Sequence, residues 1–295
     1  MAQLPEGFRV GHWTDPDRRS GCTVILPPQG NVASCDIRGS APSSRELALL
    51  DTERRLTEIH AVVLTGGSAF GLASAHGVME WLAERGIGYQ TSVATVPIVT
   101  AAVINDLRSA VPGARPGPDE GRAACDDASD GDVATGRIGV GVGATVGKWA
   151  GLEFGVAGGF GAATLVERDT EVAAVAVVNS VGDVLAEDGH VVAGTSDPNP
   201  AYRPPPPRTS AAPSNTVLAV VAVKAGMEKR EAKWVAERGS DGIAIAVRPA
   251  HTRYDGDVVF AIAAPPDPDR PPANLDFIGM LATQAVAAAI RDAVS

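Results

Sequence analysis

The chain has 295 residues, of which 45% are hydrophobic and 20% charged, and its formal net charge is −10. This length and apolar content are sufficient for a sizeable hydrophobic core and exclude a mostly disordered chain. The negative charge argues against non-specific binding to nucleic acid or to an anionic membrane surface. The three cysteines cannot form a disulfide framework, and neither a signal peptide nor a membrane-spanning stretch is recognisable. We therefore expect a soluble cytoplasmic protein that binds neither nucleic acid nor membranes.

The first half of the chain alternates short apolar runs with turn residues. The runs GCTVILP and VASCDIRG predict two strands of a hairpin, and RELALLDTERR predicts a short helix. A buried strand, AVVLTGG, then leads through a turn into a helix that ends at Gly86. Residues 136–163 alternate glycine with valine, isoleucine and alanine, which indicates strands packed closely against another backbone.

The second half begins with a strong strand, EVAAVAVVNSVGDVL, that turns at Gly182–Asp183. Residues 194–215 contain seven prolines and predict an extended or mobile linker. The elements expected after the linker are a buried strand (TVLAVVAV), a charged helix (MEKREAKWVAERG), two strands (GIAIAVRP and VVFAIAA) and a closing helix (FIGMLATQAVAAAIRDAV). This mixture of strands and helices indicates one α/β domain.

The common motifs for cofactors and metals are incomplete in this chain. The glycine-rich segment fails two of the four requirements of a phosphate-binding Walker loop, and no strand precedes its dinucleotide-type match. The histidines show neither H-E-x-x-H nor paired Cys/His spacing. We therefore expect no cofactor and no metal.

Ser68 is one candidate nucleophile. It follows a strand and opens a helix, as in the nucleophile elbow of a serine α/β-hydrolase. The run GGSAFG, however, lacks the last glycine of the G-x-S-x-G pattern. A serine hydrolase that uses Ser68 therefore stays an alternative.

The junction between Asn215 and Thr216 is a second candidate. The proline-rich linker stops at Asn215, and Thr216 is the first residue of a buried strand. If the chain were cut there, the threonine hydroxyl would be a nucleophile and its own α-amine the base. An α-amine suits this task because its unperturbed pKa is about 7.7–8.0. From these residues alone, a threonine that simply begins a strand is the simpler interpretation.

Seven blocks of sequence, between about Val10 and Ala263, resemble the P1 (DmpA-type) peptidase family. The blocks are CDIRGSAPSSRELALL, AVVLTGGSAFGLASAHGVMEWL, VPIVTAAVINDL, GVGVGATVGKWAG, AVVNSVGDV, NTVLAVVAVKAGMEKREA and RPAHTRYDGDVVFAIA. The family includes L-aminopeptidase/D-esterases, β-peptidyl aminopeptidases and endo-type hydrolases of nylon (6-aminohexanoate) oligomers. The resemblance implies a four-layer αββα sandwich like that of N-terminal-nucleophile hydrolases.

The resemblance also implies one domain over residues 1–295 that cleaves itself into residues 1–215 and 216–295. The two subunits would stay together, and we expect a homo-oligomer of such cleaved pairs. Asn215–Thr216 matches the family's self-cleavage site, which makes Thr216 the nucleophile and places the chain in the threonine branch.

The remaining site residues follow from the same resemblance. Asp255 and Asp257 match two acidic positions that would orient the threonine hydroxyl and hold its ammonium form, although D-G-D is also typical of an ordinary turn. Asn179 matches the amide that donates to the oxyanion, and Lys148 matches a basic residue able to balance two buried carboxylates. Asn105 replaces an aromatic residue of the threonine branch, and we expect it to shape the substrate pocket.

The sequence therefore predicts an autoprocessing N-terminal-threonine amidohydrolase. Its substrates would be small or oligomeric amides, with aminopeptidase action as the nearest alternative. The difference at Asn105 leaves the substrate open. A relative that has the fold and does not cleave itself is a further alternative.

Overall fold

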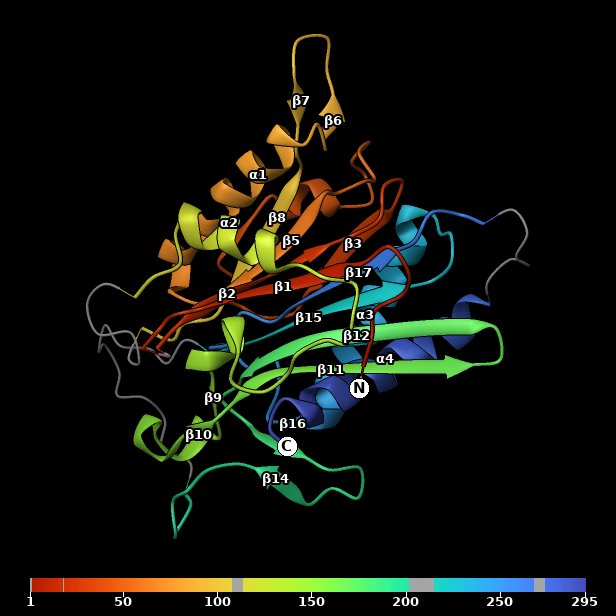
Figure 1. Cartoon of the computed structure of the whole chain (residues 1–295). Helices are drawn as coiled ribbons and strands as arrows, with labels where there is room; N and C mark the ends of the chain where they lie inside the picture. The colour runs from red at the N-terminus through yellow and green to blue at the C-terminus, as the bar shows by residue number, and fades with distance from the viewer. Residues whose placement is uncertain (1, 18, 108–113, 202–214, 268–273) are drawn as a thin grey trace.

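Runs of valine, alanine and isoleucine form two five-stranded sheets at the centre of the molecule (Figure 1). The structure is a computed structural model, and it describes residues 2–17, 19–107, 114–201, 215–267 and 274–295. The first sheet has the order β1 (Arg9–Thr14), β2 (Gly21–Leu26), β5 (Ala61–Thr65), β8 (Val99–Val103) and β4 (Ser44–Arg45). The second has the order β11 (Gly159–Glu167), β12 (Thr170–Asn179), β15 (Thr216–Val223), β17 (Val258–Ala263) and β3 (Val32–Ile37).

In the described part of the chain, four α-helices cover the outer faces of the two sheets (Figure 1). The helices α1 (Ser74–Glu84) and α2 (Pro118–Asp127) share a core with the first sheet. The helices α3 (Lys229–Ala246) and α4 (Leu275–Asp292) share another core with the second sheet. A third core, which includes Leu64, Phe160 and Phe260, lies between the sheets. The four-layer αββα sandwich expected from the sequence is confirmed.

Strand β15 shows why its sequence is apolar throughout. Leu218, Val220 and Ala222 point into the core between the sheets, whereas Val217 and Val221 point into the core beneath α3 and α4. Because both faces of the strand are buried, alternate polar residues would be unfavourable. β15 pairs antiparallel with β12 and parallel with β17, so it lies in the middle of its sheet.

Two predictions for the first half of the chain are wrong. β2 and β3 do not form a hairpin, because β2 pairs with β1 and β5 in one sheet whereas β3 pairs with β17 in the other. The segment RELALLDTERR forms only the short strand β4 and a single 3₁₀ turn, Leu47–Leu50. Glu46, which precedes that turn, has a φ of 60°, and this left-handed conformation cannot continue a helix.

Two later predictions need correction as well. Within residues 136–163, Gly139–Gly143 is a 3₁₀ turn and not a strand. The expected close approach of this segment to another backbone is present. A Cβ at Gly141 would lie 2.3 Å from the backbone nitrogen of Phe160. The expected strand GIAIAVRP is mostly the end of α3, because Gly242 brings α3 against α4: a Cβ there would lie 2.4 Å from the Thr283 carbonyl oxygen.

The remaining elements are short and lie at the edges of the sandwich. The two-stranded pairs and small sheets contain β6 (Tyr89–Gln90), β7 (Thr95–Val96), β9 (Thr145–Val146), β10 (Val156–Ala157), β13 (Asp183–Leu185), β14 (Val191–Ala193) and β16 (Val247–Arg248). The further 3₁₀ turns are Ser68–Ala73, Lys148–Ala150 and Leu152–Phe154. Most of the expected linker 194–215 falls outside the described residues. Within the described ranges, no helix has the length and apolarity to cross a membrane.

Candidate active site

Thr216, the first residue of β15, is buried at the point where β15 faces the end of β12. It pairs in the antiparallel register with Asn179, the last residue of β12. The Thr216 hydroxyl donates a hydrogen bond to the carbonyl oxygen of Asn215 over 2.5 Å. The backbone amide of Gly256 donates to the same oxygen over 2.8 Å. The carbonyl before Thr216 is thus held by two donors, one of which is the candidate nucleophile.

Gly256 lies directly against the threonine hydroxyl. A Cβ at this position would lie 2.9 Å from Thr216 Oγ1 and 2.8 Å from the carbonyl oxygen of Ala41. No ordinary side chain fits there without displacing the hydroxyl or the backbone. The D-G-D motif therefore needs its glycine for close approach, a role that the interpretation as a turn did not identify.

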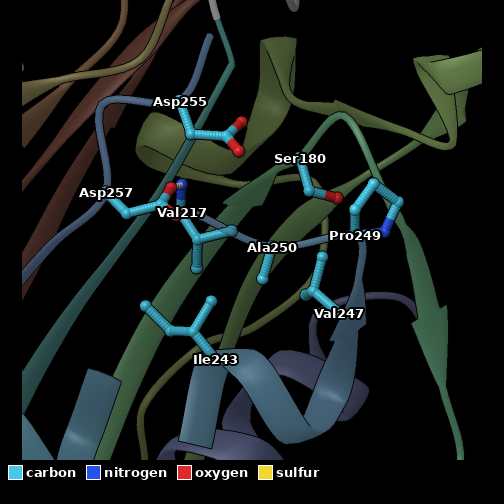
Figure 2. Close-up of a pocket in the computed structure, with 8 residues that line it drawn as sticks. All are labelled: Ser180, Val217, Ile243, Val247, Pro249, Ala250, Asp255 and Asp257. Carbon is cyan, nitrogen blue, oxygen red and sulfur yellow. Dashed lines mark hydrogen bonds between the residues drawn. The ribbon is translucent and has the colours of Figure 1, made fainter. Parts of the chain in front are cut away.

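Asp257 lies beside Val217 at the start of β15 (Figure 2) and also contacts His251. Its Oδ1 accepts a hydrogen bond from the backbone amide of Val217 over 2.7 Å. Its Oδ2 lies 2.8 Å from His251 Nδ1, and it also accepts from the His251 backbone amide over 3.3 Å. Both oxygens of this buried carboxylate therefore have partners, and one partner is the residue that follows Thr216.

Asp255 differs from Asp257 in having one oxygen unused. Its Oδ2 accepts a hydrogen bond from the Thr252 backbone amide over 2.6 Å. Its Oδ1 is buried and has no hydrogen-bond partner among the described residues. Burial and the negative charge of Asp257 raise the pKa of Asp255 to about 6. A carboxyl group with this pKa can release and accept a proton near neutral pH.

Asn179 is oriented by Lys148. The Lys148 ammonium donates to Asn179 Oδ1 over 2.9 Å and to its backbone carbonyl over 3.2 Å, and the Thr145 amide donates to the same Oδ1 over 3.1 Å. The Nδ2 group, which is the amide's donor, points to the carbonyl oxygen of Asn105 over 3.4 Å. These contacts bring Lys148, Asn179 and Asn105 together.

His251 is a basic side chain that contacts Asp257, and the sequence patterns did not identify it. The available signal was its position in the motif HTRYDGD, six residues before Asp257. The spacing patterns of metal-ligating histidines do not reveal such a contact. Among the described residues, no cluster of three or more His, Cys, Asp or Glu side chains could hold a metal ion.

Ser68 lacks a histidine partner in the described part of the chain. The histidines contact Thr23 (His12), the Ile98 amide (His60), Glu80 (His76), Asp188 (His190) and Asp257 (His251). A nucleophilic serine needs a base within hydrogen-bond reach. The geometry around Ser68 therefore does not support the serine-hydrolase alternative.

A small hollow lies beside the acidic pair (Figure 2). Its lining residues are Ser180, Val217, Ile243, Val247, Pro249, Ala250, Asp255 and Asp257. The free space is too narrow for a water molecule. While the bond between Asn215 and Thr216 is intact, the part of the site next to Asp255 and Asp257 is therefore closely packed.

Comparison with known proteins identifies relatives along almost the whole chain. The sequence profile of Peptidase family S58 matches residues 6–295. An uncharacterized aminopeptidase from Mycobacterium leprae is 40% identical over 283 residues, which cover 87% of this chain and 76% of the relative. A 6-aminohexanoate-oligomer endohydrolase from Kocuria sp. is 30% identical over 271 residues, which cover 87% of this chain and 72% of the relative.

A solved structure shares the fold. The L-aminopeptidase D-Ala-esterase/amidase from Ochrobactrum anthropi, described as a new variant of the Ntn hydrolase fold, superposes with a TM-score of 0.72 at 20% identity. The match covers 98% of this chain and 84% of that chain. The expected likeness to N-terminal-nucleophile hydrolases is therefore confirmed.

Proposed function

Because the chain belongs to peptidase family S58, whose relatives are peptide and amide hydrolases, we propose that it is an N-terminal-threonine amidohydrolase that cleaves itself between Asn215 and Thr216. The observation that carries this proposal is the Asn215 carbonyl, held between the Gly256 amide and the Thr216 hydroxyl. This arrangement brings a nucleophile and an oxyanion donor to the same peptide bond.

Self-cleavage would begin with attack of Thr216 Oγ1 on the carbonyl carbon of Asn215. The Gly256 amide would stabilise the negative charge that develops on the carbonyl oxygen. The hydroxyl proton passes to the departing amide nitrogen of Thr216, which leaves an ester between Asn215 and the threonine oxygen. The α-amine of Thr216 is free once this ester has formed. Water then hydrolyses the ester, which releases the Asn215 carboxylate and restores the Thr216 hydroxyl.

The buried surroundings of Asn215 favour this outcome. Neither polar atom of its side-chain amide has a hydrogen-bond partner among the described residues, and the side chain is buried. An unpaired buried amide costs about 1–3 kcal/mol. Cleavage frees Asn215 to move into water, so this cost is relieved and the front of Thr216 opens to substrate.

In turnover, the hydroxyl of the mature Thr216 attacks a substrate amide. Its own α-amine takes the hydroxyl proton and delivers it to the leaving amine, which leaves an acyl ester on Thr216. Water then hydrolyses this ester, releases the acid product and restores the hydroxyl. Asn179 donates to the oxyanion, and Lys148 holds the oxygen of that amide so that Nδ2 is the atom presented. The unpartnered Oδ1 of Asp255 accepts a hydrogen bond from the new α-amine.

The proposed substrates are amide bonds of small or oligomeric compounds. The relatives include a protein named as an aminopeptidase and one named as an oligomer endohydrolase. Whether the substrate needs a free amino terminus distinguishes these two modes of cleavage. A 6-aminohexanoate oligomer and its N-acetylated form separate the two modes. Cleavage of both indicates an endo-type amidase, whereas loss of cleavage on acetylation indicates an aminopeptidase.

Intact-mass analysis under denaturing conditions tests the proposal. Wild-type protein should give two species, and the smaller should begin TVLAVV at Thr216. Thr216→Ala should give one uncut and inactive chain, whereas the control Ser68→Ala should cleave and turn over normally. An active wild-type protein that stays a single chain would contradict the mechanism.

A further inference from the structure

His251 lies on the connection between β16 and β17, and both of its ring nitrogens face hydrogen-bond acceptors. Nδ1 lies 2.8 Å from Asp257 Oδ2, and Nε2 lies 3.1 Å from the carbonyl oxygen of Ser240 in α3. A carbonyl oxygen can only accept, so Nε2 must carry a proton. Asp257 already accepts backbone N–H groups on both of its oxygens, and a proton on Nδ1 makes the ring a third donor to this carboxyl group.

We propose that His251 is a positioning residue that acts as an imidazolium, clamping Asp257 against the strand that carries the nucleophile. The proposal rests on the proposed function, because the strand residue in question is Val217, next to Thr216. The contacts form a continuous chain from α3 to β15: the Ser240 carbonyl, the His251 ring, the Asp257 carboxylate and the Val217 amide.

The charges around the ring agree with this assignment. Asp257 contacts the ring directly, Asp255 attracts the cation from the same loop, and Arg38, beyond β3, repels it. Burial opposes the charged ring, yet the hydrogen bond and charge of Asp257 outweigh it and hold the pKa of His251 above its usual 6.5. One positive charge therefore lies beside two buried carboxyl groups, which would otherwise repel each other.

The backbone at His251 restricts which substitutions are informative. Its φ is 53°, a left-handed conformation that asparagine tolerates better than alanine. Asparagine also places an amide N–H near the position of Nδ1, so His251→Asn keeps a donor to Asp257 and loses the charge. His251→Ala loses both, which separates the hydrogen bond from the charge.

An NMR titration tests the charge without reference to activity. Full-length protein labelled with ¹⁵N-histidine should show one ring with both nitrogens protonated and a pKa above 6.5, and this signal should disappear in His251→Asn. In Asp257→Asn the His251 pKa should fall below its wild-type value. A His251 ring with one protonated nitrogen and a pKa below 6.5 would overturn the proposal.

Kinetics test the positioning role. His251→Ala should lower kcat at least 10-fold with KM changed less than about 2-fold, and His251→Asn should recover part of the loss. The matched control is His190→Ala, since His190 also pairs with an aspartate, Asp188, but on the surface. Its kcat should be unchanged. A folded His251→Ala protein with wild-type kcat and pH profile would overturn the proposal.

Failure of the proposed function gives a different result. If wild-type protein neither cleaves itself nor hydrolyses amides, the function fails, while the titration still decides the charge of His251. If wild-type protein is active but the His251 ring is neutral in the titration, the proposed function stands and the proposed role of His251 as a charged positioning residue fails.

Discussion

The Asp257 carboxylate accepts a hydrogen bond from the backbone amide of Val217 over 2.7 Å, one residue beyond the candidate nucleophile Thr216. This bond joins the turn before β17 to the first residues of β15. The two strands are parallel neighbours, so the carboxylate sets how the start of β15 lies relative to the D-G-D turn.

Asp257→Asn should leave the protein folded and lower turnover by about two to four orders of magnitude, the usual effect of a positioned polar group. The amide oxygen can still accept from Val217, but an amide N–H then faces His251 Nδ1 and competes with its proton. Steady-state kinetics of cleaved protein measure the effect. The control, Asp241→Asn at a partly exposed ion pair, should stay within about 2-fold of wild type, and similar rates for the two variants would refute a role for Asp257.

Gly256→Ala should slow self-cleavage at least 10-fold, because the new methyl group would collide with Thr216 Oγ1 and with the Ala41 carbonyl oxygen. Intact-mass measurements over time after purification provide the rate. Gly131→Ala is the matched control, since a Cβ at Gly131 meets no atom within 4 Å. Equal rates of cleavage in the two variants would exclude close packing at Gly256 as a requirement.

The titration of Asp255 should make the free energy of unfolding fall as pH rises. Its folded pKa, about 6, is higher than the ordinary 3.8, so the folded protein keeps a proton that the unfolded chain releases between these values. The free energy of unfolding therefore decreases as pH rises through this interval, by about 3 kcal/mol for this one group. Urea unfolding at pH 4 and pH 7, in an uncut Thr216→Ala background, should show this decrease as the difference between the parent and its Asp255→Asn variant.

Asp255→Asn in the same background should remove that contribution, because an amide does not titrate. The variant should then be more stable at pH 7 than its parent. In a cleavable chain the same substitution should abolish most turnover, since the amide is a poorer acceptor for the Thr216 amine. An unchanged pH dependence of unfolding would refute the raised pKa.

Lys148→Met should lower kcat about 10–100-fold by releasing the amide oxygen of Asn179. If Lys148 acts through this amide, its effect should largely vanish in an Asn179→Leu background. A double-mutant cycle on kcat/KM measures the coupling. The control is Lys224→Met, which removes a partly exposed ion pair with Glu171. Additive losses would mean that Lys148 and Asn179 act independently.

The two fragments should remain associated after cleavage. In the second sheet, β15 of the small fragment pairs with β12 of the large one, and β17 pairs with β3. Separation would expose strands that are buried on both faces. Size-exclusion chromatography under native conditions should show both fragments in one peak, and elution of the small fragment alone would contradict the shared core.

Local signals in the sequence were sufficient where an element is defined by its own residues. The all-apolar runs of β12, β15 and β17 and the long apolar repeat of α4 were predicted correctly, because burial of both strand faces or of one helix face leaves a pattern within the segment. The junction Asn215–Thr216 could be singled out from the end of the proline-rich segment, whereas the roles expected for Asp255 and Asp257 followed from the resemblance to a known family.

The residue patterns by themselves therefore determined the central strands and the mixed α/β class. The four-layer arrangement and the choice of Thr216 as candidate nucleophile came from the resemblance of the sequence to a known family. Only the tertiary structure decided that β2 and β3 belong to different sheets, that Lys148 holds Asn179 and that His251 holds Asp257. Each of these depends on which surfaces meet after the chain has folded. Hydrophobic patterning specifies that a strand is buried, but it does not specify its neighbour, and hydrogen bonds between distant residues leave no periodic trace in the sequence.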